Sequence, residues 1–211
     1  MNLLVLSAIM VYGGLIPKLV TEGFGWPGKV PFKMVASTGF ILAALVSGAL
    51  DSTYGRIVLV GLAFCWIGDL LLEYDQAFLP GLVTFLLGHV AFIAGFATLG
   101  PRLSWVAPAI AVAALAAAAV AVYLHPHIPR PMRLPVYAYM AVISTMVVLA
   151  AGATGAGHTP ALLAGAVLFY VSDLFVARRQ FVTHSFKDTL YGNPLYFTAV
   201  WLIALTPGLV G

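Results

Sequence analysis

Residues 56–74, with the sequence RIVLVGLAFCWIGDLLLEY, form an apolar stretch that contains one carboxylate, Asp69, ahead of the closing Glu73. A helix of about 20 apolar residues spans the hydrocarbon core of a bilayer. An ionised aspartate inside that core costs about 2.5–3.5 kcal/mol on insertion scales, so it is seldom present without a function. The stretch 160–178 has the same character and contains Asp173. Both stretches predict membrane-spanning helices that carry functional carboxylates.

The composition of the whole chain is that of an integral membrane protein. Of its 211 residues, 62% are hydrophobic and 8% are charged, and the mean hydropathy is +1.04. A soluble domain has about 25% charged residues. The net charge of +3 comes from loop lysines and arginines that set the orientation in the membrane, so it does not indicate binding to nucleic acid. The single cysteine, Cys65, is expected to be a buried, unreactive thiol.

Apolar stretches of about 18–22 residues recur along the chain, separated by glycine, proline and charged residues. They predict an all-α polytopic membrane protein that forms one transmembrane domain, 1–211. We expect eight transmembrane helices, at residues 3–20, 31–50, 56–74, 79–99, 104–124, 131–151, 160–178 and 190–208. The first is the shortest, because Pro17 and Lys18 come near its end.

The basic residues are distributed unevenly between the two sides of the membrane. Eight of them flank the loops after the first, fifth and seventh predicted helices, and only Arg56 and Arg102 flank the loops of the other side. Because positive loops stay in the cytoplasm, the odd-numbered loops should be cytoplasmic and both termini outside, in the cytoplasmic membrane if the source is bacterial. The eight are Lys18, Lys29, Lys33, Arg130, Arg133, Arg178, Arg179 and Lys187.

Polar residues within the predicted helices gather toward that same cytoplasmic side. Asp69 and Asp173 lie near the ends of helices that run toward it, and His89 lies about three turns into a helix that starts there. A polar group inside a membrane usually faces an interior cavity and has a function. We therefore expect one cavity near the cytoplasmic leaflet. The other members fall in first turns on that side: Lys33, Tyr137, Asn193 and Tyr196.

A shift of 104 residues superimposes the two aspartates and several other features of the chain. It aligns Pro27 with Pro131, Pro31 with Pro135, Lys33 with Tyr137, and His89 with Asn193. This spacing suggests a parallel repeat of two four-helix halves, an arrangement that builds a site at the interface of the halves. Some matches are expected by chance in so apolar a chain, so the repeat is a hypothesis.

Each aspartate has a neighbour that bears on its chemistry. Glu73 follows Asp69 by four residues and so lies on the same helix face. Two carboxylates that close at low dielectric do not both ionise easily, so one should hold a proton near neutral pH; alternatively, Glu73 reaches water at the membrane surface. Ser172 lacks the Gly-x-Ser-x-Gly setting of a nucleophile, and we expect it to pack or to donate a hydrogen bond.

Histidine and the other polar residues complete the candidate site. His89 is the only histidine in a predicted helix, and with Asp69 and Asp173 it could offer three zinc ligands. Because the other histidines lie in loops, we favour acid–base chemistry by these three residues without metal or cofactor. Lys33 either anchors its helix or binds a phosphate, and Tyr137 and Tyr139 could also belong to an interfacial aromatic belt. The expected substrate-binding residues are Lys33, Glu73, Tyr137, Tyr139, Tyr170, Ser172, Asn193 and Tyr196.

The ordered set of motifs resembles the YhhN-like membrane proteins, whose characterised members are lysoplasmalogenases. The resemblance covers nearly the whole chain, and it implies that Asp69 and Asp173 are the acidic catalytic pair with His89 beside them. The chain departs from the family pattern at Arg178–Arg179, which bears on the preference for a head group. The matching segments are Phe32–Lys33, Trp66–Leu72, Phe78–Gly81, Phe85–His89, Tyr139, Met146, Gly165–Asp173 and Asn193–Tyr196.

The resemblance implies hydrolysis of the vinyl ether of a lysoplasmalogen, a lysophospholipid substrate in membrane lipid. The residues suit this reaction independently, because it needs one carboxylic acid and one carboxylate but neither a nucleophile nor a metal. A small proton-coupled transporter or channel could use the same carboxylates. The outer half of the helices has few polar residues beyond Ser47 and Ser144, which favours a one-sided site. A purely structural scaffold leaves the buried aspartates unexplained, and nothing indicates a protein partner.

Overall fold

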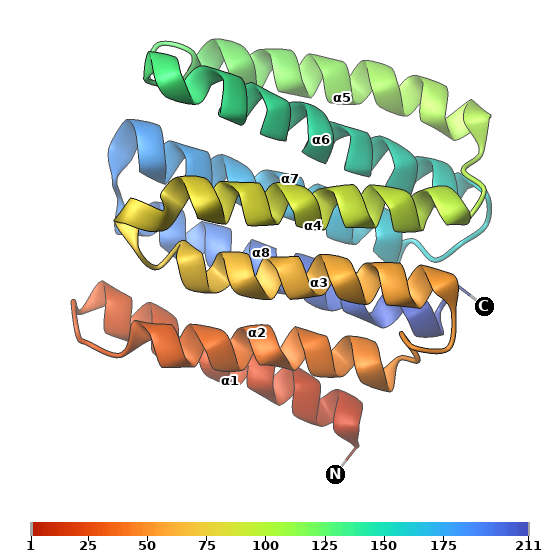
Figure 1. Ribbon diagram of the computed structural model, residues 1–211, viewed down its shortest axis with the longest axis horizontal. Helices are drawn as coiled ribbons and strands as arrows, with labels where there is room; N and C mark the ends of the chain where they lie inside the picture. Colours follow the sequence, from red (N-terminus) through yellow and green to blue (C-terminus); the bar gives the residue numbers. More distant parts are fainter. Residues whose placement is uncertain (1, 211) are drawn as a thin grey trace.

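The computed structural model describes residues 2–210 and shows eight α-helices (Figure 1). A short 3₁₀ helix, Asp75–Ala77, precedes the fourth, and a π-helix, Arg179–Thr183, continues the seventh. The all-helical fold predicted from the sequence is confirmed. The helices are α1 Leu3–Gly23, α2 Lys29–Val46, α3 Thr53–Leu71, α4 Phe78–Thr98, α5 Leu103–Leu124, α6 Arg130–Gly155, α7 Ala161–Arg178 and α8 Phe186–Leu205.

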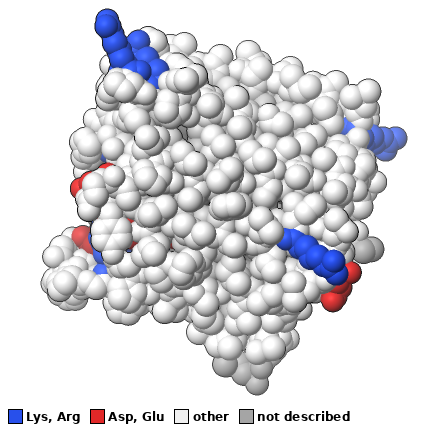
Figure 2. Space-filling view, in the orientation of Figure 1, with Lys and Arg blue, Asp and Glu red and all other residues white. Residues whose placement is uncertain are grey.

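The helices lie side by side in one bundle and alternate in direction along the chain (Figure 1). The loops after α1, α3, α5 and α7 all lie at one end of the bundle, which we call the odd-loop end. Both chain termini lie toward the opposite end. Figure 2 shows a face that is almost free of charge between these ends, as expected for a surface in contact with lipid.

Seven of the helices, α1 to α7, are long and apolar enough to cross a membrane. The protein is therefore an integral membrane protein. α8 does not reach the same hydropathy, because its first half contains Lys187, Asp188, Thr189 and Asn193. It nevertheless packs against α7, α2 and α1 within the bundle. A membrane crossing by α8 remains a prediction.

Several helix ends differ from those predicted. α2 ends at Val46 rather than near residue 50, because Gly48 adopts φ 79°, a left-handed conformation that glycine tolerates well. α3 ends at Leu71, so Asp69 lies closer to the helix end than expected. α1 continues through Pro17 to Gly23, which shows that this proline does not shorten the helix. Membrane helices tolerate proline in this way when the neighbouring structure compensates for the missing hydrogen bond.

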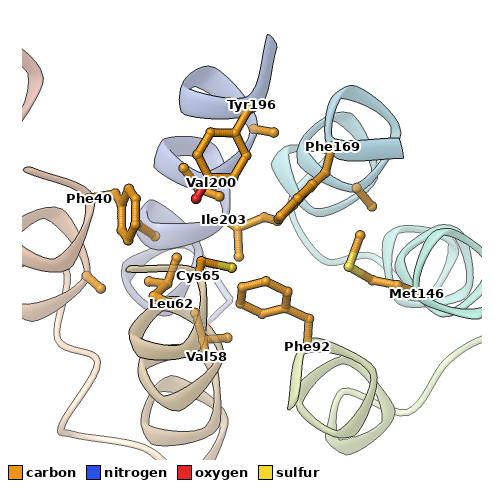
Figure 3. Packing of buried hydrophobic residues seen from close by; sticks show 14 of the residues in the cluster. Phe40, Val58, Leu62, Cys65, Phe92, Met146, Phe169, Tyr196, Val200 and Ile203 are labelled. Carbon is orange, nitrogen blue, oxygen red and sulfur yellow. The ribbon is translucent and has the colours of Figure 1, made fainter. Parts of the chain in front are cut away.

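The apolar core holds the helices that carry the polar residues in fixed positions. Side chains from seven helices converge there. They include Phe40, Leu62, Phe92 and Phe169 (Figure 3). Cys65 is fully buried among them, as predicted. α3 and α4 approach closely at Gly61, where an added Cβ would lie 2.6 Å from the ring of Phe92. This tight contact fixes α3 against α4. It lies about two helical turns from Asp69 on α3 and about one turn from His89 on α4.

Candidate active site

A cavity of about 100 Å³ contains both intramembrane aspartates in its wall. Asp69 comes from the end of α3 and Asp173 from the last third of α7, so the fold brings together residues that are far apart in the chain. The rest of the wall is mostly apolar and extends to α5 and α6. Other polar lining residues are Lys33, Tyr139, Tyr170, Ser172, Asn193 and Tyr196.

Asp69 is surrounded by hydrogen-bond donors and a cation. Its Oδ2 accepts hydrogen bonds from Ser37 Oγ (2.6 Å) and from Tyr196 Oη (2.8 Å). Lys33 Nζ lies 3.5 Å from its Oδ1. The side chain is only 2% exposed, so these groups replace the water that a carboxylate would otherwise need. They form a setting that stabilises an ionised carboxylate.

Lys33 bridges Asp69 and Glu73. Its Nζ lies 2.9 Å from Glu73 Oε1, and Lys29 Nζ lies 3.2 Å from Glu73 Oε2. The Glu73 side chain is 5% exposed, so the alternative in which it extends into water is wrong. Burial raises the pKa of the Glu73 carboxyl, but the charges of Lys33, Lys18 and Lys29 outweigh burial and bring this pKa to about 2. The lysine removes the expected conflict between two neighbouring carboxylates.

Asp173 lies in a different setting, beside neutral hydrogen-bonding groups. Tyr139 Oη donates to its Oδ2 at 2.6 Å, and His89 Nε2 lies 3.8 Å from the same oxygen. Among the described residues, no lysine or arginine forms an ion pair with Asp173. The two aspartates therefore share a cavity but differ in their electrostatic surroundings. Such a difference allows two carboxyl groups to take different protonation states.

His89 is fully buried behind Asp173. Its Nδ1 lies 2.6 Å from the carbonyl oxygen of Phe85. Because a carbonyl only accepts, Nδ1 must be the protonated nitrogen, and in the neutral ring Nε2 then carries a lone pair. This Nε2 has no hydrogen-bond partner among the described residues. The ring also packs against Tyr139 and Phe169, with centroid separations of 5.2 and 4.5 Å. His89 does not line the cavity itself, so it can reach substrate only through Asp173.

Two further polar groups at the cavity have unused hydrogen-bonding capacity. The side-chain Nδ2 of Asn193 and the Oη of Tyr170 are buried and have no hydrogen-bond partner among residues 2–210. Both residues line the cavity. A buried donor without a partner is costly, so these atoms are suited to contact a polar ligand.

The remaining predicted residues divide between the cavity and its surroundings. Ser172 lines the cavity, and its Oγ donates to the carbonyl of Phe169 on its own helix (2.7 Å). Tyr137 does not line it; its hydroxyl is 2.6 Å from Nδ1 of His125 near the odd-loop end. Ser37 was not identified from the sequence, although its position one turn after Lys33 offered a signal.

A second, polar cavity of about 290 Å³ lies next to the first, at the odd-loop end. We call it the vestibule. Ion pairs lie around it: Glu22 binds Lys18 on its own helix (2.5 Å) and Arg179 (3.0 Å), and the second pair links α1 to the π-helix. Its charged and polar lining residues are Lys18, Lys29, Lys33, Glu73, Asp75, Arg179, Gln180, His184, Asp188, Thr189 and Asn193.

The described residues do not bring three histidine, cysteine, aspartate or glutamate side chains into an arrangement that could hold a metal ion. Lys33, Ser37 and Tyr196 already contact the Asp69 carboxylate, and among these four residue types only His89 lies near Asp173 in the part of the chain that the structure describes. The geometry thus offers carboxylates, phenols and one imidazole for proton transfer.

The sequence profile of the YhhN family matches residues 28–207, which is most of the chain and includes every residue that lines the aspartate cavity. The chain belongs to the YhhN family. The resemblance seen in the sequence motifs is thereby confirmed. The match to the YhhN family begins just before α2, so it includes Lys33 and every helix that contributes to the cavity. No curated protein and no solved structure gave a match.

Proposed function

We propose that this YhhN-family protein is a lysoplasmalogenase, which hydrolyses the vinyl ether of a lysoplasmalogen to a fatty aldehyde and a glycerophospho-head group. The observation that carries the proposal is one cavity containing two aspartates, of which one lies beside a cation and the other beside neutral groups. Membership of the YhhN family supports a hydrolase. The apolar remainder of the cavity suits a hydrocarbon chain.

The reaction needs an acid and then a base. A proton transferred to the β-carbon of the vinyl ether gives an oxocarbenium ion, whose positive charge a nearby carboxylate stabilises. Water then adds to the cationic carbon and loses a proton to that carboxylate. The resulting hemiacetal then breaks its carbon–oxygen bond: the protonated carboxyl gives its proton to the departing glycerol oxygen, and the carboxylate left by the first step takes the proton of the hemiacetal hydroxyl, which releases the aldehyde and the glycerol hydroxyl. One water molecule is consumed and the acid is regenerated.

The surroundings of the two aspartates suggest their roles. Asp69, beside the Lys33 ammonium, serves as the ionised carboxylate that stabilises the cation and receives the proton from water. Asp173, beside Tyr139 and His89, supplies the proton to carbon. Tyr139 and His89 serve as positioning residues for the Asp173 carboxyl: the Tyr139 hydroxyl donates to it, and the His89 ring lies behind it. Tyr139 also lines the cavity, so it can contact the lipid as well.

The helix contacts support the idea of two related halves. α2 packs on α3 as α6 packs on α7, and α3 pairs with α4 as α7 pairs with α8. α2 contacts α8 as α6 contacts α4. Asp69 accepts hydrogen bonds from Ser37 on α2 and Tyr196 on α8. Correspondingly, Asp173 accepts one from Tyr139 on α6 and has His89 of α4 nearby. We infer a parallel 4+4 repeat with one aspartate from each half.

We further propose that the odd-loop end faces the cytoplasm and that α8 is an eighth span. The excess of basic residues at this end supports the orientation, which places the site near the cytoplasmic leaflet. Reporter fusions after Val210 and between Thr183 and Phe186 are expected to give opposite locations, with the C-terminus outside. A cytoplasmic signal from the C-terminal fusion contradicts this topology.

The direct test supplies purified protein with a lysoplasmalogen and measures free aldehyde. We expect aldehyde release without added metal, and we expect it to survive a strong chelator, because the described residues offer no set of metal ligands. Activity lost on chelation and restored by zinc contradicts the acid–base mechanism. Complete absence of aldehyde favours the transporter or channel instead.

A further inference from the structure

The vestibule and the cavity that holds the two aspartates adjoin and share part of their walls, and they differ in chemical character. The far wall of the aspartate cavity is apolar and includes Val120, Leu124 and Phe181. The vestibule contains most of the charged groups of the odd-loop end. Residues that line both are Lys33, Leu72, Phe78, Val176, Gly192 and Asn193.

Four cationic side chains line the vestibule, and they differ in availability. Lys18 and Lys33 are buried, and carboxylates engage them at 2.5 and 2.9 Å. Lys29 and Arg179 are 34% and 46% exposed at their side chains, and each is held by one carboxylate. Because an ammonium group has three donors and a guanidinium group five, both retain donors for an anion in the vestibule.

Asn193 lies where the two spaces meet. Its Nδ2 is buried and has no hydrogen-bond partner within residues 2–210. A ligand that extends from the vestibule to the aspartates would lie beside this amide, and an oxygen atom of that ligand can accept its hydrogen bond. The order along the space is then cations, amide, aspartates and apolar wall.

We propose that the vestibule binds the glycerophosphate of a single-chain phospholipid, with Lys29 and Arg179 at the phosphate and Asn193 at the glycerol. The identity of the lipid rests on the proposed function, in which the ether bond lies at the aspartates. The glycerol unit connects that bond to the phosphate, and it therefore lies in the shared part of the space. Phosphate oxygens are preferred partners for such cations.

The test compares the binding of two ligands that have the same chain and no vinyl ether. Lysophosphatidylethanolamine carries the phosphate, and the corresponding monoacylglycerol lacks it. We expect the wild-type protein to bind the phospholipid about tenfold more tightly, as charge-assisted hydrogen bonds predict. The double variant Lys29→Gln/Arg179→Gln should reduce this ratio to about one while binding of monoacylglycerol persists, which shows an intact apolar cavity.

Arg130→Gln is the matched control, since it removes one exposed cation from the same end and does not line either cavity. It should keep the wild-type ratio. A wild-type protein without preference for the phosphate, or a double variant that keeps the preference, overturns the proposal. Displacement of the lipid by inorganic phosphate as effectively as by glycerophosphoethanolamine also overturns it, since the site would then bind free phosphate.

The aldehyde assay separates this inference from the proposed reaction. A phosphate preference that depends on Lys29 and Arg179, without release of aldehyde from lysoplasmalogen, supports the vestibule and contradicts the reaction. Release of aldehyde by a protein that lacks the preference supports the reaction and contradicts the vestibule.

Discussion

Asp69→Asn and Asp173→Asn are each expected to lower the rate of aldehyde release by about 10²–10⁴-fold, the usual contribution of a positioned acid or base. Asparagine has nearly the same shape as aspartate, but it neither donates a proton to carbon nor accepts one from water. Because both carboxyl groups lie in the wall of one cavity, either loss should stop the reaction. The effect should appear in kcat, measured at saturating lysoplasmalogen.

Asp51→Asn provides a control, because Asp51 is exposed in the loop between α2 and α3, away from the odd-loop end. This variant should release aldehyde at the wild-type rate. Helical content and thermal unfolding in detergent verify that the site variants remain folded. Near wild-type turnover by either site variant would falsify a mechanism that uses both carboxylates.

Lys33→Met is expected to have the largest effect on stability. It leaves Asp69 without its cation and removes the shorter of the two ion pairs of Glu73. Loss of one partner from a buried ion pair costs about 3–5 kcal/mol, because the other charge remains buried without compensation. A large fall in the unfolding temperature, measured in detergent, should accompany the loss of activity.

The double variant Lys33→Met/Asp69→Asn distinguishes charge from packing. Removing the carboxylate that the lysine neutralises should recover part of the stability, so the two changes should be clearly non-additive. Additive losses would indicate that Lys33 contributes mainly through the packing of its aliphatic chain. Wild-type stability in Lys33→Met would contradict a buried ion-pair network.

The number and order of the helices could be predicted because apolar stretches and glycine or proline punctuation are strong signals in a membrane protein. The ends were harder to place. α2 ends at Val46, where the left-handed Gly48 follows, and α3 ends at Leu71, just before the ion-paired Glu73. Neither feature is visible in hydropathy.

The positions of the site residues along their helices could be predicted, but the directions in which their side chains point could not. The positions of Asp69, Asp173 and His89 along their helices placed all three toward the same side of the membrane, and the structure puts the aspartates in one cavity with His89 beside Asp173. Tyr137 and Tyr139 differ by two residues, which is about 200° around a helix. Only one of them can face Asp173, and the packing of the helices determines which one. The sequence of a helix that is apolar on all sides does not show how the helix is rotated about its own axis.

The low hydropathy of α8 bears on how the protein is made. A helix that contains Asp188, Thr189 and Asn193 partitions poorly into lipid by itself. It contacts α7 and α2, which precede it in the chain and are therefore synthesised before it. Insertion of α8 is therefore expected to depend on the helices that precede it, and the site can be complete only after α8 has packed against them.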